Sequence, residues 1–170
     1  MSESRPLGGR VLVAEDESYV RESLVAMLVS RGFEVSSAAS VDEAEEELKR
    51  SSVDVVLSDL RMPGGGGLEL VKRFHEALPE LPIIILTGHG TVASAVECLR
   101  AGASDYILKP ADPEELEVAL TRALEARSLR RELRYLRGDA TRDADPVGES
   151  SAWGRVMAMI EAAARVDSPV

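Results

Sequence analysis

The chain has 170 residues, with 30 acidic and 20 basic side chains and a formal net charge of −10. This length suits one well-filled domain with a modest extension and is short for two full domains. The negative charge argues against general affinity for nucleic acid, because another polyanion would be repelled.

Two further sequence features indicate the cellular compartment of the protein. Cys98 is the only cysteine, so an internal disulfide is impossible and a reducing compartment is indicated. Residues 1–10 lack an apolar leader, and no apolar run approaches the roughly 18 residues that span a bilayer. We therefore expect a cytoplasmic protein that does not contact a membrane.

The first half of the chain alternates short apolar runs with segments of helical period. A strand is predicted over residues 10–14, followed by a helix from Ser18 that ends at Gly32. A short strand at residues 33–37 precedes a second helix, for which Ser40 and Glu43 have the spacing of a capping box. Residues 53–58 are almost entirely apolar, which indicates a central strand covered on both faces.

The second half continues this alternation. Residues 63–67 are predicted to form a loop before a third helix, which contains Phe74 and stops before Pro79. A strand beginning at Pro82, a helix ending near Gly102 and a strand at residues 104–108 follow, and Asp112 then starts a fifth helix that continues to about residue 137. Five such units predict an α/β fold, a doubly wound, flavodoxin-like parallel sheet with strand order 2-1-3-4-5.

Four of the predicted strands end on residues that suit a single phosphate-handling site. Glu15 and Asp16 follow the first strand, Asp59 the third, Thr87 the fourth and Lys109 the fifth. Taken alone, each is commonly a cap, a turn residue or a surface side chain. Because the carboxyl ends of parallel strands open onto one crevice, the four ends together predict a site.

The chemistry of these side chains points to Mg²⁺ and a phosphoryl group. Mg²⁺ prefers carboxylate and phosphate oxygens, and Glu15, Asp16 and Asp59 would repel one another without a cation. A carboxylate such as Asp59 is able to attack phosphorus and form an acyl phosphate. Lys109 would neutralise phosphoryl charge, and Thr87 would donate a hydrogen bond to it.

These residues lie in four stretches that resemble the receiver domain of two-component response regulators. The stretches are residues 11–17 (VLVAEDE), 54–63 (DVVLSDLRMP), 83–90 (IIILTGHG) and 102–110 (GASDYILKP). The resemblance covers about residues 8–127. It implies that Asp59 accepts phosphate from a sensor histidine kinase, and that the domain is a phosphoacceptor regulator and not an enzyme.

The resemblance also assigns roles around Asp59. It implies that Asp16, Asp59 and the backbone carbonyl of Arg61 bind Mg²⁺, with Glu15 nearby. Thr87 and Lys109 are implied to engage the phosphoryl group. Glu15 is a departure from the family, which usually has two aspartates at this position, and we expect the longer side chain to alter metal affinity.

Two further features follow from the same resemblance. Tyr106 is implied to be an aromatic switch that turns inward when Thr87 moves toward the phosphate; without the family, it would equally suit a half-buried strand position. The bond between Lys109 and Pro110 is implied to be cis. The glycine run at residues 64–67 departs from the family, because it lacks the usual Met-Asp pair before the last glycine.

The fifth helix has an apolar seam of coiled-coil spacing. Ala126, Leu129, Leu133 and Leu136 step by three, four and three residues, and five arginines surround them on the rest of the helix: Arg127, Arg130, Arg131, Arg134 and Arg137. A basic helix of this kind either pairs with another helix or binds nucleic acid, and the apolar seam favours pairing. We therefore predict a homodimer through this helix, with residues 128–146 forming a coiled-coil extension and linker.

The last segment, residues 147–170, resembles the opening of the AAA+ domain of NtrC-type activators of sigma-54 RNA polymerase. The sequence contains no GxxxxGK[ST] phosphate-binding loop, so ATPase activity is expected only in a longer chain. The resemblance implies that sigma-54 RNA polymerase and DNA are partners of that longer protein.

Two other functions stay open on sequence grounds. One is a Mg²⁺-dependent phosphohydrolase with Asp59 as its nucleophile, although Arg61 stands where such enzymes usually carry a second aspartate. The other is a stand-alone receiver without transcriptional output. The leading hypothesis is a receiver whose phosphorylation changes the dimer arrangement, and so the activity, of a sigma-54-dependent activator.

Overall fold

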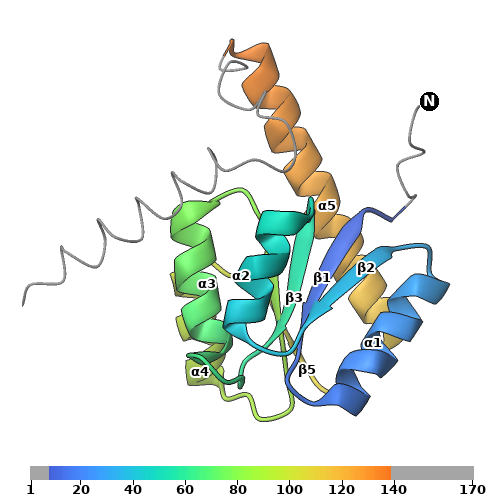
Figure 1. Ribbon diagram of the computed structural model, residues 1–170. Helices are drawn as coiled ribbons and strands as arrows, with labels where there is room; N and C mark the ends of the chain where they lie inside the picture. The colour runs from blue at the N-terminus through green and yellow to red at the C-terminus, as the bar shows by residue number, and fades with distance from the viewer. Residues whose placement is uncertain (1–7, 139–170) are drawn as a thin grey trace, which may run out of the picture.

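The computed structural model describes residues 8–138. Five strands alternate with five helices in this part of the chain (Figure 1). The strands are β1 (Arg10–Ala14), β2 (Glu34–Ala38), β3 (Val55–Asp59), β4 (Ile83–Thr87) and β5 (Asp105–Leu108). The helices are α1 (Ser18–Ser30), α2 (Val41–Arg50), α3 (Gly66–Ala77), α4 (Val92–Ala101) and α5 (Pro113–Leu136). The expectations for residues 147–170 and for the linker beyond residue 138 lie outside the described residues.

The strands form one parallel sheet in the order β2-β1-β3-β4-β5, which confirms the predicted flavodoxin-like topology. Strands β3 and β4 lie in the interior of this order, and their apolar residues are buried on both faces. The sequence showed this as nearly continuous apolar runs. Asp59 and Thr87 are the last residues of these two buried strands.

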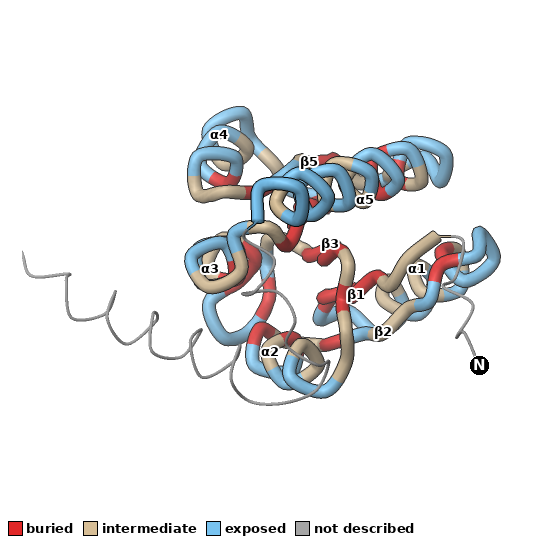
Figure 2. The backbone as a smooth tube through the Cα atoms, turned by 90° about the horizontal axis from the view of Figure 1, so that it is seen from above, coloured by how far each residue is buried: buried red, intermediate tan, exposed pale blue. Residues whose placement is uncertain are grey.

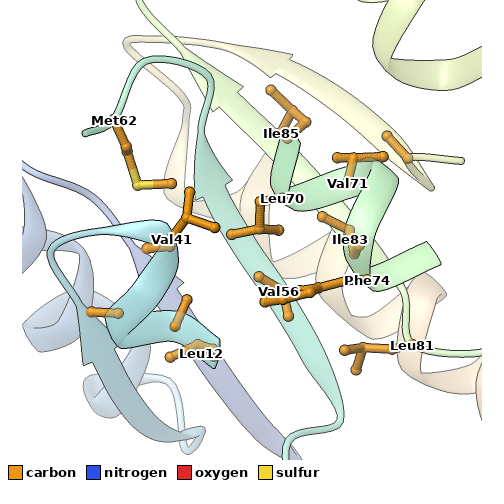
Figure 3. Packing of buried hydrophobic residues seen from close by; sticks show 14 of the residues in the cluster. Leu12, Val41, Val56, Met62, Leu70, Val71, Phe74, Leu81, Ile83 and Ile85 are labelled. Carbon is orange, nitrogen blue, oxygen red and sulfur yellow. The ribbon is translucent and has the colours of Figure 1, made fainter. Parts of the chain in front are cut away.

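Alternate residues along each strand point to opposite faces, so the sheet divides the core in two. Helices α2, α3 and α4 cover one face, and α1 and α5 cover the other, as the view from above shows (Figure 2). On the first face Leu12, Val56, Phe74 and Ile83 belong to one buried cluster (Figure 3). Cys98 is buried in the same cluster.

The helix starts agree with the capping signals in the sequence. The Ser40 hydroxyl accepts a hydrogen bond from the Glu43 amide at 3.2 Å, and Asp112 accepts one from the Glu114 amide at 2.8 Å. The Glu43 carboxylate accepts from the Ala39 amide, one residue before the position that a standard capping box uses. The peptide bond between Lys109 and Pro110 is cis, as the family resemblance implied.

One prediction about the glycine run is wrong. Gly66 and Gly67 belong to α3, although residues 63–67 were predicted to be a loop. The Gly67 amide donates to the Leu60 carbonyl at 2.9 Å, so the first turn of α3 lies directly against the end of β3. A Cβ atom on Gly67 would lie 2.3 Å from the Asp59 carbonyl oxygen. The glycines therefore allow a helix to approach the strand end closely.

Strand β3 also differs from prediction at both ends. It begins at Val55 and includes Asp59, whereas residues 53–58 were expected. Val53 and Asp54 bond instead to the last helix: Arg127 donates to the Val53 carbonyl at 2.8 Å and to Asp54 Oδ1 at 3.1 Å. These polar contacts hold the start of β3 against α5.

Helix α5 continues well beyond the sheet, as Figure 1 shows in orange. Its 24 residues confirm the predicted extended helix, which ends at Leu136. Arg134 forms an ion pair with Glu80 in the connection before β4, and Arg127 is bonded to the residues before β3. Two contacts thus orient α5 relative to the domain. None of the helices within residues 8–138 is long and apolar enough to cross a bilayer.

Candidate functional site

The five predicted site residues meet at the carboxyl edge of the sheet. Glu15 and Asp16 follow β1, Asp59 ends β3, Thr87 ends β4 and Lys109 follows β5. Among the described residues, Glu15, Asp16 and Asp59 each offer a carboxylate oxygen within 4.8 Å of the other two. Oxygens on opposite sides of one Mg²⁺ lie about 4 Å apart, so this cluster has the size and chemistry of a magnesium site.

Lys109 joins two of these carboxylates. Its ammonium donates to Glu15 Oε2 at 2.6 Å and lies 3.4 Å from Asp59 Oδ1. Burial acts to lower the pKa of Lys109, but the hydrogen bond to Glu15 and the charges of Asp59 and Glu15 outweigh it, so the pKa is raised. The lysine therefore stays a cation beside the phosphoacceptor candidate.

Glu15 is the most deeply buried acid of the three, with 3% of its surface exposed. Burial raises the pKa of Glu15 above its ordinary value, while hydrogen bonds from Lys109 and from the Glu17 amide act in the opposite direction. The Glu15 carboxylate lies 2.6 Å from the Lys109 ammonium. Glu15 thus serves first as the partner of Lys109, whereas Asp16 is exposed and open to a cation.

Asp59 is held by its own turn. Its Oδ2 atom accepts a hydrogen bond from the Arg61 amide at 3.2 Å, and Oδ1 faces Lys109. Ten per cent of its side chain is exposed, which leaves the carboxylate accessible at the edge of the sheet. The structure shows the amide of Arg61 in contact with Asp59; the metal-binding role of the Arg61 carbonyl stays a prediction.

Thr87 and Tyr106 lie on the neighbouring strands. Thr87 is 1% exposed; its hydroxyl accepts from the His89 amide at 3.3 Å, and its carbonyl accepts from the Lys109 amide at 2.8 Å. Tyr106 is half-buried on β5, and its hydroxyl lies 3.0 Å from the Ser94 hydroxyl on α4. The sequence reading did not identify Ser94, because a serine in the first turn of a helix is an ordinary capping residue.

Arg21 is a second contributor that the sequence reading missed. Its guanidinium donates to the backbone carbonyl of Glu15 at 2.7 Å and to that of Asp16 at 3.3 Å. It therefore fixes the turn that presents the two acids. A cation five residues after an acidic pair was the available signal, but the same spacing is common on exposed helix surfaces.

Comparison with known proteins agrees with this geometry. The family model described as "Response regulator receiver domain" matches residues 11–121. The chain belongs to this family. Receiver domains are phosphoacceptor regulatory domains, so the acidic pocket is a receiver pocket.

The similar proteins are transcriptional regulators and receivers. The chain is 33% identical to the alginate biosynthesis transcriptional regulatory protein AlgB of Pseudomonas putida over 158 residues, 93% of this chain and 35% of that protein. It is 34% identical to the regulatory protein AtoC of Escherichia coli over 148 residues, 87% of this chain and 31% of that protein. The chain thus spans about a third of these relatives, and they confirm the resemblance to NtrC-type activators over their N-terminal part.

Solved structures of similar fold also include an NtrX protein and a receiver domain. NtrX from Brucella abortus, determined with ATP, superimposes with a TM-score of 0.72 at 31% identity, covering 93% of this chain and 35% of that one. A receiver domain from Clostridium thermocellum superimposes with a TM-score of 0.68 at 31% identity, covering 71% of this chain and 98% of that one.

The Glu15 contact gives a testable stability effect. Lys109→Ala leaves a buried carboxylate without its ammonium partner, so we expect the free energy of unfolding to fall by about 2 kcal/mol. Urea unfolding with EDTA present measures this, with Lys72→Ala, an exposed lysine on α3, as the matched control. Equal stability of the two variants would show that the Glu15 contact contributes nothing.

Proposed function

We propose that this receiver takes a phosphoryl group from a sensor histidine kinase onto Asp59 in a Mg²⁺-dependent step. The observation that supports this most strongly is the position of Asp59, with two other carboxylates within 4.8 Å and the Lys109 ammonium 3.4 Å away. An anionic nucleophile is thereby held beside one cation and a group of metal ligands. The protein acts in the cytoplasm, where such kinases place their phosphohistidine.

The residues divide the chemistry between them. An Asp59 carboxylate oxygen forms a bond to phosphorus while the bond from phosphorus to the kinase histidine breaks, and the histidine nitrogen keeps the electron pair. Lys109 balances the negative charge that gathers on the phosphoryl oxygens. Asp16, Asp59 and the Arg61 carbonyl would hold Mg²⁺, with Glu15 acting through water, and the ion would supply positive charge to neutralise the phosphoryl oxygens. Thr87 donates its hydroxyl to a phosphoryl oxygen.

Phosphorylation then changes the surface of the domain. Thr87 moves toward the phosphoryl group, Tyr106 turns inward, and the arrangement of α4 and α5 changes. In a longer protein this change alters how a dimer of receivers holds two AAA+ modules, and thereby controls a sigma-54-dependent transcription activator that acts on RNA polymerase and DNA. The similarity to AlgB and AtoC supports this output, as does the helix that projects beyond the sheet.

A phosphohydrolase that uses Asp59 as its nucleophile is the alternative from another class. Arg61 stands two residues after Asp59, where such enzymes usually carry a second aspartate, and its backbone amide donates to the Asp59 carboxylate. Incubation with acetyl phosphate and Mg²⁺ separates the two functions. A receiver gives a phosphorylated protein that persists long enough for intact-mass detection, whereas a phosphohydrolase turns over many phosphate esters without accumulating an adduct.

The dimer proposal rests on an apolar face of α5. Leu129, Leu133 and Leu136 are 58%, 46% and 74% exposed, and lie on the predicted seam. Exposed apolar side chains at three successive seam positions are typical of a helix that pairs with another helix. We propose that a second copy of the chain covers it.

Sedimentation velocity at micromolar concentration tests this pairing. We expect a dimer for the full chain and at least about tenfold weaker association for Leu133→Glu, because a charge would enter an apolar seam. Arg131→Glu is the matched control, since the 100° spacing of helical residues puts position 131 on the opposite side of α5. A wild-type monomer with and without phosphate would contradict the proposal.

A further inference from the structure

We infer that Ser94 is a positioning residue of the receiver switch, which ties the Tyr106 hydroxyl to the first turn of α4. The inference rests on the proposed function and adds a residue that the sequence did not single out. Tyr106 belongs to β5 and Ser94 to α4, and their hydroxyl oxygens lie 3.0 Å apart. This hydrogen bond directly connects a site strand with the neighbouring helix.

The other hydrogen bonds of Ser94 favour one direction for this bond. A serine hydroxyl has one proton and two lone pairs. Ser94 donates its proton to the Thr91 carbonyl at 2.9 Å and accepts from the Thr91 amide at 2.9 Å. One lone pair remains, and the Tyr106 hydroxyl at 3.0 Å is nearer to it than the Thr91 hydroxyl at 3.3 Å. With the Ser94 proton on the Thr91 carbonyl, Tyr106 is the donor and Ser94 the acceptor.

The same serine completes the cap of α4. Thr91 is the N-cap residue, and its hydroxyl accepts from the Ser94 amide at 3.1 Å while the Ser94 hydroxyl accepts from the Thr91 amide. The oxygen that receives the tyrosine proton is thus fixed by the backbone of the helix start. Because this acceptor is rigid, a displacement of α4 moves Tyr106, and a movement of Tyr106 displaces α4.

Gly90 provides the surface on which the tyrosine lies. A Cβ atom at this position would be 2.2 Å from the Tyr106 hydroxyl oxygen and 3.0 Å from Cζ. The phenol end of the ring therefore rests against the backbone of the connection between β4 and α4. Gly90 is three residues after Thr87 and Ser94 is seven, so one short segment carries the phosphoryl-binding hydroxyl and both tyrosine contacts.

These contacts make a coupling prediction. A shift of Thr87 toward a phosphoryl group moves the segment that contacts Tyr106 at Gly90 and Ser94. By thermodynamic reciprocity, loss of the Tyr106 to Ser94 bond must then change the affinity of the site for a phosphoryl group. Removing either hydroxyl abolishes the same bond, so the two losses do not add.

The test is a double-mutant cycle on beryllofluoride affinity, measured with Mg²⁺ on the full chain; beryllofluoride mimics a phosphoryl group on a carboxylate. We expect Ser94→Ala and Tyr106→Phe each to change Kd about fivefold in the same direction, and the double variant to change it by about the same factor. Ser94→Thr, which keeps the hydroxyl, should restore the wild-type value. The inference would be overturned if the Kd changes of the two single variants multiplied in the double variant, or if Tyr106→Phe left Kd unchanged.

A capping variant separates positioning from stability. Thr91→Ala removes the acceptor of the Ser94 amide but leaves the tyrosine contact, so it should lower the melting temperature while leaving beryllofluoride affinity unchanged. If it shifts affinity as much as Ser94→Ala, the effect comes from capping and the inference is wrong.

A spectroscopic readout follows the tyrosine without any ligand. The chain has three tyrosines, so fluorotyrosine labelling gives three fluorine resonances, of which the one absent in Tyr106→Phe belongs to Tyr106. Ser94→Ala should shift it more than Thr91→Ala does, and an unmoved resonance would overturn the inference. If the wild type fails to bind beryllofluoride, the proposed function fails, while this resonance still tests the contact.

Discussion

Asp59→Asn is expected to lose phosphorylation completely while keeping the fold. An amide oxygen is a poor nucleophile and carries no charge, so neither attack on phosphorus nor full metal binding is retained. Asparagine has the same shape, and its side-chain oxygen still accepts the hydrogen bond that the Arg61 amide donates to Asp59 at 3.2 Å. Lys109 keeps its contact with Glu15 at 2.6 Å, so no buried ammonium is left without a partner.

The measurement is intact-mass spectrometry after incubation with acetyl phosphate and Mg²⁺. Asp42→Asn is the matched control, because it makes the same substitution at an exposed acid in the first turn of α2. We expect one added phosphoryl group for the wild type and for Asp42→Asn, and none for Asp59→Asn. An adduct that survives in Asp59→Asn would assign the phosphoryl group to another residue.

Gly67→Ala is expected to lower the free energy of unfolding by about 3 kcal/mol, near the upper end for overpacking. The added Cβ would lie 2.3 Å from the Asp59 carbonyl oxygen and 3.0 Å from the Leu60 Cα atom. Both neighbours are backbone, which cannot rotate away as a side chain does. Either α3 or the end of β3 must shift.

The functional consequence distinguishes this variant from a simple loss of stability. Because the displaced backbone carries Asp59, we expect Mg²⁺ affinity to fall together with stability. Gly88→Ala is the stability control, since its Cβ would meet nothing closer than Lys109 Cβ at 3.9 Å. Urea unfolding and Mg²⁺ titration measure the two effects. A Gly67→Ala protein as stable as Gly88→Ala would show that α3 does not press on the strand end.

The sheet and the position of the site were predictable from sequence because burial leaves a strong pattern. The apolar runs around Val56 and Ile84 predicted central strands, and right-handed crossovers favour the strand order that the structure has. Once the strands are parallel, Asp59 and Thr87 must meet at one edge. The chemistry of the site then follows from residue types alone.

Other features depend on tertiary contacts that leave no periodic signal. Gly66 and Gly67 have poor helix propensity, yet they form the first turn of α3 because close packing against β3 needs them there. The pairing of Glu15 with Lys109 joins residues 94 apart, and sequence cannot set the direction of a long lysine side chain. Such contacts appear only when the fold is in place.

Helix α5 has some features that the sequence predicted and some contacts that it did not. Its extension and exposed leucines were predicted from the repeat, whereas its arginines were expected only to flank the seam. Arg127 and Arg134 instead bond to the residues before β3 and β4. The sequence does not show whether an arginine beside an apolar seam faces solvent or bonds to another part of the domain.

Storage of the phosphoryl group on Asp59 is tested by locating that group on the wild-type chain. Borohydride reduces an acyl phosphate to an alcohol, which marks the modified carboxylate for peptide mass spectrometry. After incubation with acetyl phosphate and Mg²⁺, we predict a single alcohol, at position 59, that is absent when EDTA replaces Mg²⁺. An alcohol at Glu15 or Asp16, or no reduced residue despite rapid consumption of acetyl phosphate, would contradict storage of the phosphoryl group on Asp59.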